Sequence, residues 1–310
     1  MNLERLGAGA LFLAGISACA PAARPSVAPA PGGSPMRVVH DSIVRVLDRA
    51  LADSAFPGAI SVVGTRDGGM TSYAVGRIDW PASAPPPDER TLWDLASLTK
   101  VVGMTTAMMQ LVEQDRVELD APVTRYLPEF AGEGKERVTI RHLLTHSSGL
   151  PSWRPLYKEA TAADTAVAIV FATPLDTVPG ARMAYSDLGA ILLGKVVERV
   201  SGETLDAYLA RHVLGPLGMT STLYRPDASL RDRIAPTEFD PWRQRHIRGE
   251  VHDENAFMLG GVSGHAGLFS TAADLARFAR MMLSGGTLDG VRVLRASTIA
   301  QFTAVQDPGL

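Results

Sequence analysis

The apolar residues of this chain change their spacing near Thr91. Before it, residues 38–51 carry apolar side chains at helical spacing, and the run Gly-Ala-Ile-Ser-Val-Val-Gly at 58–64 predicts a buried strand. An Asp-Gly-Gly turn at 67–69 predicts a return into a second strand near 70–75. A helix followed by a hairpin indicates an α+β layer.

Helical patterns dominate after Thr91, and Pro/Gly-rich breaks separate them. The chain can bury a full core, because it has 310 residues and 46% of them are hydrophobic. An Asp-Gly pair at 289–290 sits between apolar runs and predicts a hairpin turn. The predicted helices cover residues 98–114, 140–145, 162–171, 188–200, 205–214, 272–283 and 296–302.

Charge and cysteine content exclude several classes of function. The formal net charge is −3, from 30 basic and 33 acidic residues, and no run of like charges forms a phosphate-binding stripe. We therefore expect no nucleic-acid partner. The single cysteine, Cys19, excludes an internal disulfide framework and a cysteine-based zinc site.

The N-terminal residues have the pattern of an export signal. Arg5 precedes an apolar segment, 6–16, that is too short to span a bilayer, and small residues lead into Cys19. Ile-Ser-Ala-Cys resembles the bacterial lipobox, which predicts lipidation at Cys19; Ala18-Cys19-Ala20 would also suit an ordinary signal peptidase. We expect a periplasmic or cell-envelope lipoprotein held to the membrane by an N-terminal lipid anchor, with plain secretion as the alternative.

These observations divide the chain into three parts. Residues 1–19 form the predicted signal peptide, and residues 20–36 form a Pro/Ala-rich linker whose composition cannot support a packed core. Residues 37–310 form the predicted folded domain.

A serine and a lysine lie three residues apart at the start of a predicted helix. In Ser97-Leu98-Thr99-Lys100 this spacing places the hydroxyl and the amine on one face, within contact distance. A serine hydroxyl needs a neighbouring base to become a nucleophile, and a lysine can be that base if its surroundings lower its pKa. The spacing alone is weak because chance produces it, but apolar residues surround the pair, and an unpaired charge there would be costly.

A second polar group precedes the apolar helix at 188–200. In Tyr185-Ser186-Asp187 the phenol can carry a proton between nucleophile and leaving group if it lies beside Lys100. The structural alternative is an N-cap formed by Ser-Asp with a core tyrosine.

Together these motifs identify a family resemblance. Ser-x-x-Lys, the segment Thr-Ile-Arg-His-Leu-Leu-Thr-His-Ser-Ser-Gly-Leu-Pro at 139–151, Tyr-Ser-Asp, and Gly-Leu-Phe-Ser-Thr-Ala-Ala-Asp-Leu at 267–275 resemble the serine β-lactamase-related superfamily over about residues 37–284. The similar branch holds class C β-lactamases, D,D-peptidases and family VIII esterases. The resemblance implies a helical domain beside an antiparallel α/β sheet domain, acylation of Ser97, and proton transfer by Lys100 and Tyr185.

Asp187 departs from the family pattern. The second motif commonly ends in Asn, whose amide donates a hydrogen bond to substrate, whereas an ionised Asp187 only accepts. An ionised carboxylate near Lys100 would favour the charged amine, which makes Tyr185 the better candidate for the base. We hypothesise that Asp187 tunes the site away from β-lactam turnover and contacts substrate.

The family's third motif is the other departure. His265-Ala266-Gly267 is a candidate for this Lys/His-Thr/Ser-Gly strand, with a structural loop histidine as the alternative. In that alternative the motif would lie beyond Leu310, and the chain would be incomplete at its C-terminus, with an unpaired sheet edge and reduced stability or activity.

Other candidates are weaker. Gly261-Val262-Ser263-Gly264-His265 lacks the last glycine of a nucleophile elbow, and the four-residue spacing of His142 and His146 suits a packed turn better than a metal site. The polar cluster at 252–255 either borders the pocket or forms a solvated loop or a cap.

We therefore predict a serine hydrolase without metal or organic cofactor, acting on an amide or ester in a small molecule or a peptidoglycan-derived substrate. A catalytically silent lipoprotein that captures a cell-wall ligand is the alternative. The sequence predicts no oligomeric state.

Overall fold

A computed structural model describes residues 35–306 of the chain. The predicted signal peptide at 1–19, its Cys19, and the linker up to residue 34 lie outside the described residues, as do the last four positions. Among residues 35–306, each helix is too short or too polar to span a lipid bilayer.

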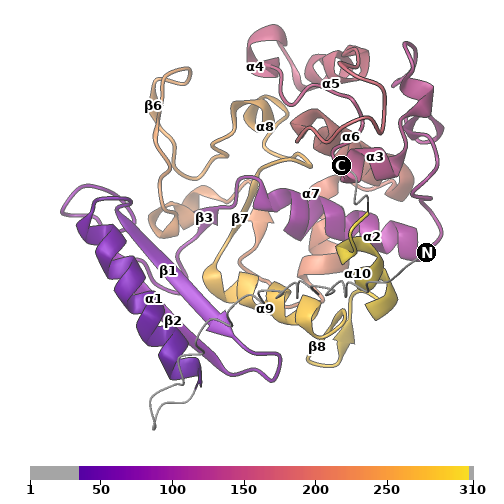
Figure 1. Cartoon of the computed structure of the whole chain (residues 1–310). Coiled ribbons are helices and arrows are strands. Elements are labelled where there is room, and N and C mark those ends of the chain that lie inside the picture. The colour runs from indigo at the N-terminus through magenta and orange to yellow at the C-terminus, as the bar shows by residue number, and fades with distance from the viewer. Residues whose placement is uncertain (1–34, 307–310) are drawn as a thin grey trace, which may run out of the picture.

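The first layer is a helix packed on a hairpin, as the spacing before Thr91 predicts (Figure 1). Helix α1 (Pro35–Ala52) packs against strands β1 (Gly58–Gly64) and β2 (Met70–Gly76). The strands pair antiparallel, from Gly58 opposite Gly76 to Gly64 opposite Met70. Helix α9 (Ala272–Leu283) packs against β1 and joins this layer to the rest of the molecule.

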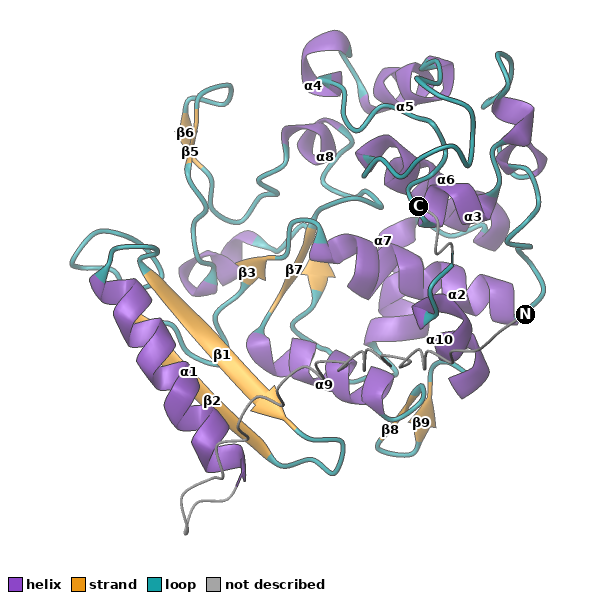
Figure 2. Ribbon diagram, in the orientation of Figure 1, coloured by secondary structure: helices purple, strands orange, loops and turns teal. Residues whose placement is uncertain are grey.

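The helical region is built around α6 (Asp187–Ser201), whose apolar residues are almost all buried. Helices α2 (Thr106–Glu113), α3 (Ile140–Leu144), α5 (Ala163–Ala172) and α7 (Leu205–Leu209) all contact it. The periodicity therefore predicts the elements that form the main core, which is one cluster of buried side chains. Helix α10 (Ala296–Thr303) packs against α2 (Figure 2).

Two predicted α-helices differ from the structure in their turn type. The expected helix at 98–114 contains a π-helical segment, η1 (Lys100–Thr105), before α2, and the one at 205–214 continues after α7 as a second π-helical segment, η4 (Ala210–Leu214). Hydrophobic spacing cannot distinguish an α-helix from a π-helical turn, because both place apolar residues on one broad face. π-Helical turns are frequent at functional sites, and η1 starts at Lys100.

A small central sheet has no counterpart in the sequence prediction. Its antiparallel strands are β3 (Trp93–Asp94), β7 (Leu268–Ser270) and β4 (Leu223–Tyr224), in the order β3-β7-β4. Runs of two or three residues are too short to show a period of two. The sheet places the turn that follows β3 beside the loop that precedes β7.

Short elements complete the described chain. The hairpin predicted at the Asp-Gly pair is present. The other short segments lie mostly in connections for which the sequence predicts loops and no regular structure. These elements are α4 (Leu156–Glu159), α8 (Glu254–Met258), β5 (Phe239–Asp240) with β6 (Arg245–His246), β8 (Thr287–Leu288) with β9 (Val291–Arg292), and the 3₁₀ turns Val123–Arg125, Lys135–Arg137 and Ala228–Arg233.

Gly264 allows the loop before β7 to approach α6. A Cβ atom at this position would lie 2.1 Å from the Ala190 carbonyl oxygen, whereas one at Gly189 would meet its nearest atom at 3.6 Å. We expect Gly264→Ala to lower the free energy of unfolding by about 1–3 kcal/mol, because the backbone must shift. Gly189→Ala, the matched control inside α6, should be neutral or stabilising. Urea unfolding measures both, and equal effects of the two changes would contradict this account.

Candidate active site

Strand β3 and a strained corner present Ser97. The Asp94 carboxylate accepts a hydrogen bond from the Ala96 N–H at 2.8 Å, and Ala96 has a left-handed φ of 45°. This conformation is unfavourable for a residue with a Cβ and is typical of sites held by their surroundings. The chain then enters the first helical turn with the Ser97 side chain exposed and Lys100 only 5% exposed.

The Lys100 amine is held by oxygen atoms from separate segments. Its Nζ donates to Ser97 Oγ at 2.9 Å and to the His265 carbonyl oxygen at 3.1 Å. Asp187 Oδ1 lies 2.7 Å from the same nitrogen; within residues 35–306 no aligned hydrogen bond reaches this oxygen, so the contact is one of opposite charges. The expected contact between hydroxyl and amine is present, and the surroundings suit an ammonium group with its three donors.

Tyr185 lies on the open side of this cluster. Lys100 Nζ is 4.9 Å from the centroid of its ring, and the side chain is 45% exposed. The ring also packs against His146, with 4.5 Å between the two centroids. The structure thus brings Ser97, Lys100, Tyr185 and Asp187 together.

His146 is a neighbour of the site that the sequence interpretation assigned to a packed turn. Its Nδ1 accepts the Ser186 N–H at 3.1 Å, so in a neutral ring the proton is on Nε2. Burial lowers the pKa of His146, the Lys100 charge lowers it further, and Asp187 opposes them. A neutral imidazole therefore contacts Tyr185 at neutral pH.

Ser186 and Asp187 have different tasks at the start of α6. Ser186 Oγ caps the helix by accepting the Gly189 N–H and donates to the Pro151 carbonyl. Asp187 donates its N–H to the Ser152 carbonyl at 2.9 Å and directs its carboxylate to Lys100. The capping alternative is thus correct for Ser186, while Asp187 faces the cluster.

His265 contacts the site through its backbone. Its side chain is 1% exposed, between Ser263 Oγ at 2.7 Å from Nδ1 and Asp253 Oδ1 at 2.8 Å from Nε2. The residue lies in the loop before β7 rather than in a strand, which favours the loop-histidine alternative. In this arrangement the ring is closed off from a substrate.

The polar cluster at 252–255 supports the floor of the site. Asp253 caps α8 by accepting the Ala256 N–H, and the His252 N–H binds Asp94 Oδ2 at 2.7 Å. Burial raises the pKa of Asp94. Burial also acts to raise the pKa of Asp253, but the hydrogen bond and attraction of His265, the Ala256 N–H and the Lys100 charge lower it to about 2. The cap alternative is thus correct, and the same residue holds His265.

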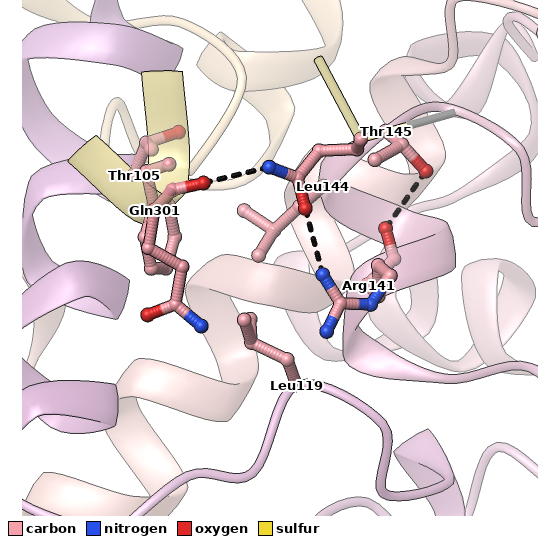
Figure 3. Close-up of a pocket in the computed structure, with 8 residues that line it drawn as sticks. Thr105, Leu119, Arg141, Leu144, Thr145 and Gln301 are labelled. Carbon is pink, nitrogen blue, oxygen red and sulfur yellow. Dashed lines mark hydrogen bonds between the residues drawn. The ribbon is translucent and has the colours of Figure 1, made fainter. Parts of the chain in front are cut away.

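A separate pocket is lined by other residues. Figure 3 shows its wall formed by Thr105, Arg141, Leu144 and Gln301, and neither Ser97 nor Lys100 is among the residues that line it. Within residues 35–306 no group of three or more His, Cys, Asp or Glu side chains is arranged to hold a metal ion.

Fold and site define the class of protein. A buried lysine touches an exposed serine one turn earlier, beside a tyrosine loop, where a helical region meets a small antiparallel sheet. Residues 43–309 match the Beta-lactamase family, and the chain therefore belongs to it. The prediction of a serine β-lactamase-related hydrolase family is confirmed.

Relatives and solved structures agree with this assignment. The chain is 36% identical over 241 residues to a putative D-alanyl-D-alanine carboxypeptidase of Escherichia coli K12, covering 69% of this chain and 55% of that protein. It is 33% identical over 297 residues to an N-acetylmuramyl-L-alanine amidase of Bacillus subtilis, covering 84% and 66%. The chain thus spans between about half and two thirds of the length of these relatives.

The predicted fold is also confirmed. A class C β-lactamase structure gives a TM-score of 0.70 at 21% identity, covering 87% of this chain and 69% of that one. An octameric penicillin-binding protein homologue from Pyrococcus abyssi gives 0.68 at 23% identity, covering 86% and 61%. Such likeness establishes the α+β β-lactamase/transpeptidase-like fold.

The low pKa of Asp253 predicts a pH-dependent contribution to stability. The folded pKa of about 2 lies below the ordinary aspartate pKa of 3.8, so the carboxylate stabilises the fold above pH 3.8 and loses this effect as the pH falls through 2. Asp253→Asn, which keeps a capping side chain, should cost about 2 kcal/mol at pH 7 and about half as much at pH 3. Urea unfolding at both pH values measures the difference, and a pH-independent cost would refute the assignment.

Proposed function

We propose that this chain supplies the acyl-forming site of a serine hydrolase that cleaves an amide bond in peptidoglycan-derived substrates. The observation that carries the proposal is the buried Lys100 amine, 2.9 Å from the exposed Ser97 hydroxyl. The names of the two relatives, a carboxypeptidase and an N-acetylmuramyl-L-alanine amidase, favour an amide over an ester.

Ser97 is the nucleophile in this proposal, and Tyr185 is the base. Lys100 is surrounded by acceptors and acts as a cation that orients Ser97 Oγ and stabilises the Tyr185 phenolate. The Ser97 proton passes to the phenolate as Oγ attacks the carbonyl carbon, and the phenol returns it to the departing amine nitrogen. Water then hydrolyses the acyl-enzyme by the reverse route.

The backbone of Ser97 can stabilise the oxyanion. Within residues 35–306 its N–H has no acceptor, while the following amides of Leu98, Thr99 and Lys100 are bonded to carbonyl groups of this first turn. A free N–H beside the nucleophile is a donor suited to the charge that develops on the carbonyl oxygen.

Covalent labelling tests the nucleophile. A fluorophosphonate probe should label the wild-type chain, Ser97→Ala should abolish the label, and Lys100→Met should slow labelling at least ~100-fold because proton transfer is disturbed. Lys195→Met is the matched control, since Lys195 pairs with Glu198 on α6 and should leave the rate unchanged. Labelling that persists in Ser97→Ala would refute the assignment, and an unlabelled wild type would favour a silent binding protein.

The charge of Asp187 predicts a change in substrate preference. Asp187→Asn removes the contact of opposite charges with Lys100 and adds an amide donor, so hydrolysis of a chromogenic cephalosporin should rise several-fold. Asp187→Glu keeps the charge and should give no such rise. Loss of amide hydrolysis in Asp187→Asn without any gain on the cephalosporin would end the hypothesis that Asp187 directs the site away from β-lactams.

A further inference from the structure

Four aromatic rings form a continuous row near the proposed active site. Trp153 and Tyr157 have ring centroids 6.5 Å apart, Tyr157 and Trp242 4.8 Å, and Trp242 and Phe257 6.0 Å. The rings come from the α4 region, the turn between β5 and β6, and α8. We call these four residues the aromatic row.

The two tryptophans of the row are the open ones. Trp153 is 49% exposed and Trp242 is 38% exposed. Lys158 Nζ lies 5.3 Å from the Tyr157 ring, and the Arg243 guanidinium lies 4.8 Å from the Phe257 ring, so a cation accompanies each of the two less exposed rings. A ligand would therefore meet the indoles.

Buried polar groups fix the row in place. Asn255, fully enclosed, accepts the Tyr157 N–H and donates to the Arg154 carbonyl, which ties α8 to α4. Arg243, also enclosed, pairs with Asp240 and donates to carbonyl groups of the segment before α8. Exposed rings on a rigid base lose little freedom when they bind, which is the condition for a preformed subsite.

The row is joined to the active site at both ends. Trp153 follows directly on Ser152, whose carbonyl accepts the Asp187 N–H. At the other end, Asp253 caps α8 and holds His265, whose carbonyl holds Lys100. Figure 1 shows α4, α8 and the β6 hairpin on one side of the molecule, above the β3 and β7 strands. A substrate acylating Ser97 could thus extend over the row.

The chemistry of the row selects a neutral ring that carries hydrogen-bond acceptors. Among the described residues nothing accepts a hydrogen bond from Nε1 of Trp153 or Trp242, so both exposed indoles keep a free donor beside an apolar face. An N-acetylated sugar ring offers a C–H face for the indole and carbonyl and hydroxyl oxygens for the N–H groups.

We propose that the aromatic row is a subsite for an N-acetylated sugar ring of the substrate, with the scissile amide at Ser97. This deepens the proposed function, on which it rests, and the amidase relative is named for an N-acetylmuramyl substrate. The sugar ring binds the row while the acyl group reacts at Ser97.

Binding of tri-N-acetylchitotriose to the full chain tests the proposal without any turnover. Titration calorimetry should detect binding to wild type, and Trp242→Ala and Trp153→Ala should each raise the Kd at least about tenfold. Trp80→Ala is the matched control, because Trp80 is 63% exposed but lies outside the row, and its Kd should stay within about twofold. Trp242→Phe should retain part of the affinity.

Each other outcome overturns the proposal. Absence of binding to wild type, equal loss in Trp80→Ala, or equal binding of maltotriose would contradict an N-acetyl-sugar subsite. Fluorophosphonate labelling of Ser97 in the wild type and in Trp80→Ala, which lies outside the row and should react at the wild-type rate, separates the two claims. If the wild type binds the sugar but is not labelled, the hydrolase proposal fails, and with it the claim that the bound sugar belongs to a substrate of Ser97; the row is then a sugar-binding site only.

Discussion

The buried amine of Lys100 is the constraint around which this structure is arranged. Removing an ammonium group from water is costly unless oxygen atoms replace the lost hydration. Those oxygens come from the turn after β3, the start of α6 and the loop before β7. Segments far apart in the sequence must therefore converge, and the small sheet β3-β7-β4 brings two of them side by side.

The convergence of distant segments explains which parts of the molecule the sequence predicts: local contacts can be predicted, whereas contacts between distant segments cannot. The contact of Ser97 with Lys100 is local, since one helical turn brings residues three apart together. Helix α6 and the β1–β2 hairpin also follow from local periodicity. The strand pairing of Asp94 with Phe269 spans most of the domain and has no local pattern long enough to be read.

The same difference between local and distant contacts divides the site residues into those that the sequence identifies and those that it does not. Tyr185 and Asp187 could be named because a motif precedes a clear apolar helix, although their contact with Lys100 is non-local. For Asp253 the sequence leaves a pocket border and a cap open, and for His146 it indicates a packed turn, because their partners, His265 and Tyr185, lie in other segments. The aromatic row is of this second kind, since its rings come from three separate segments, the α4 region, the β5–β6 turn and α8, each too short to show periodicity.

The site is thus divided between two environments. Its charged part is enclosed, and Asp187 and the Asp253–His265 pair surround Lys100 there with negative and polar groups. Its outer part is open and aromatic, from Tyr185 to the exposed indoles of Trp153 and Trp242. Electrostatic interactions are strong in the first and weak in the second, because water screens the outer surface. Chemistry at Ser97 should therefore depend on the buried charges, whereas the choice of substrate should depend on the shape and apolar faces of the outer rings.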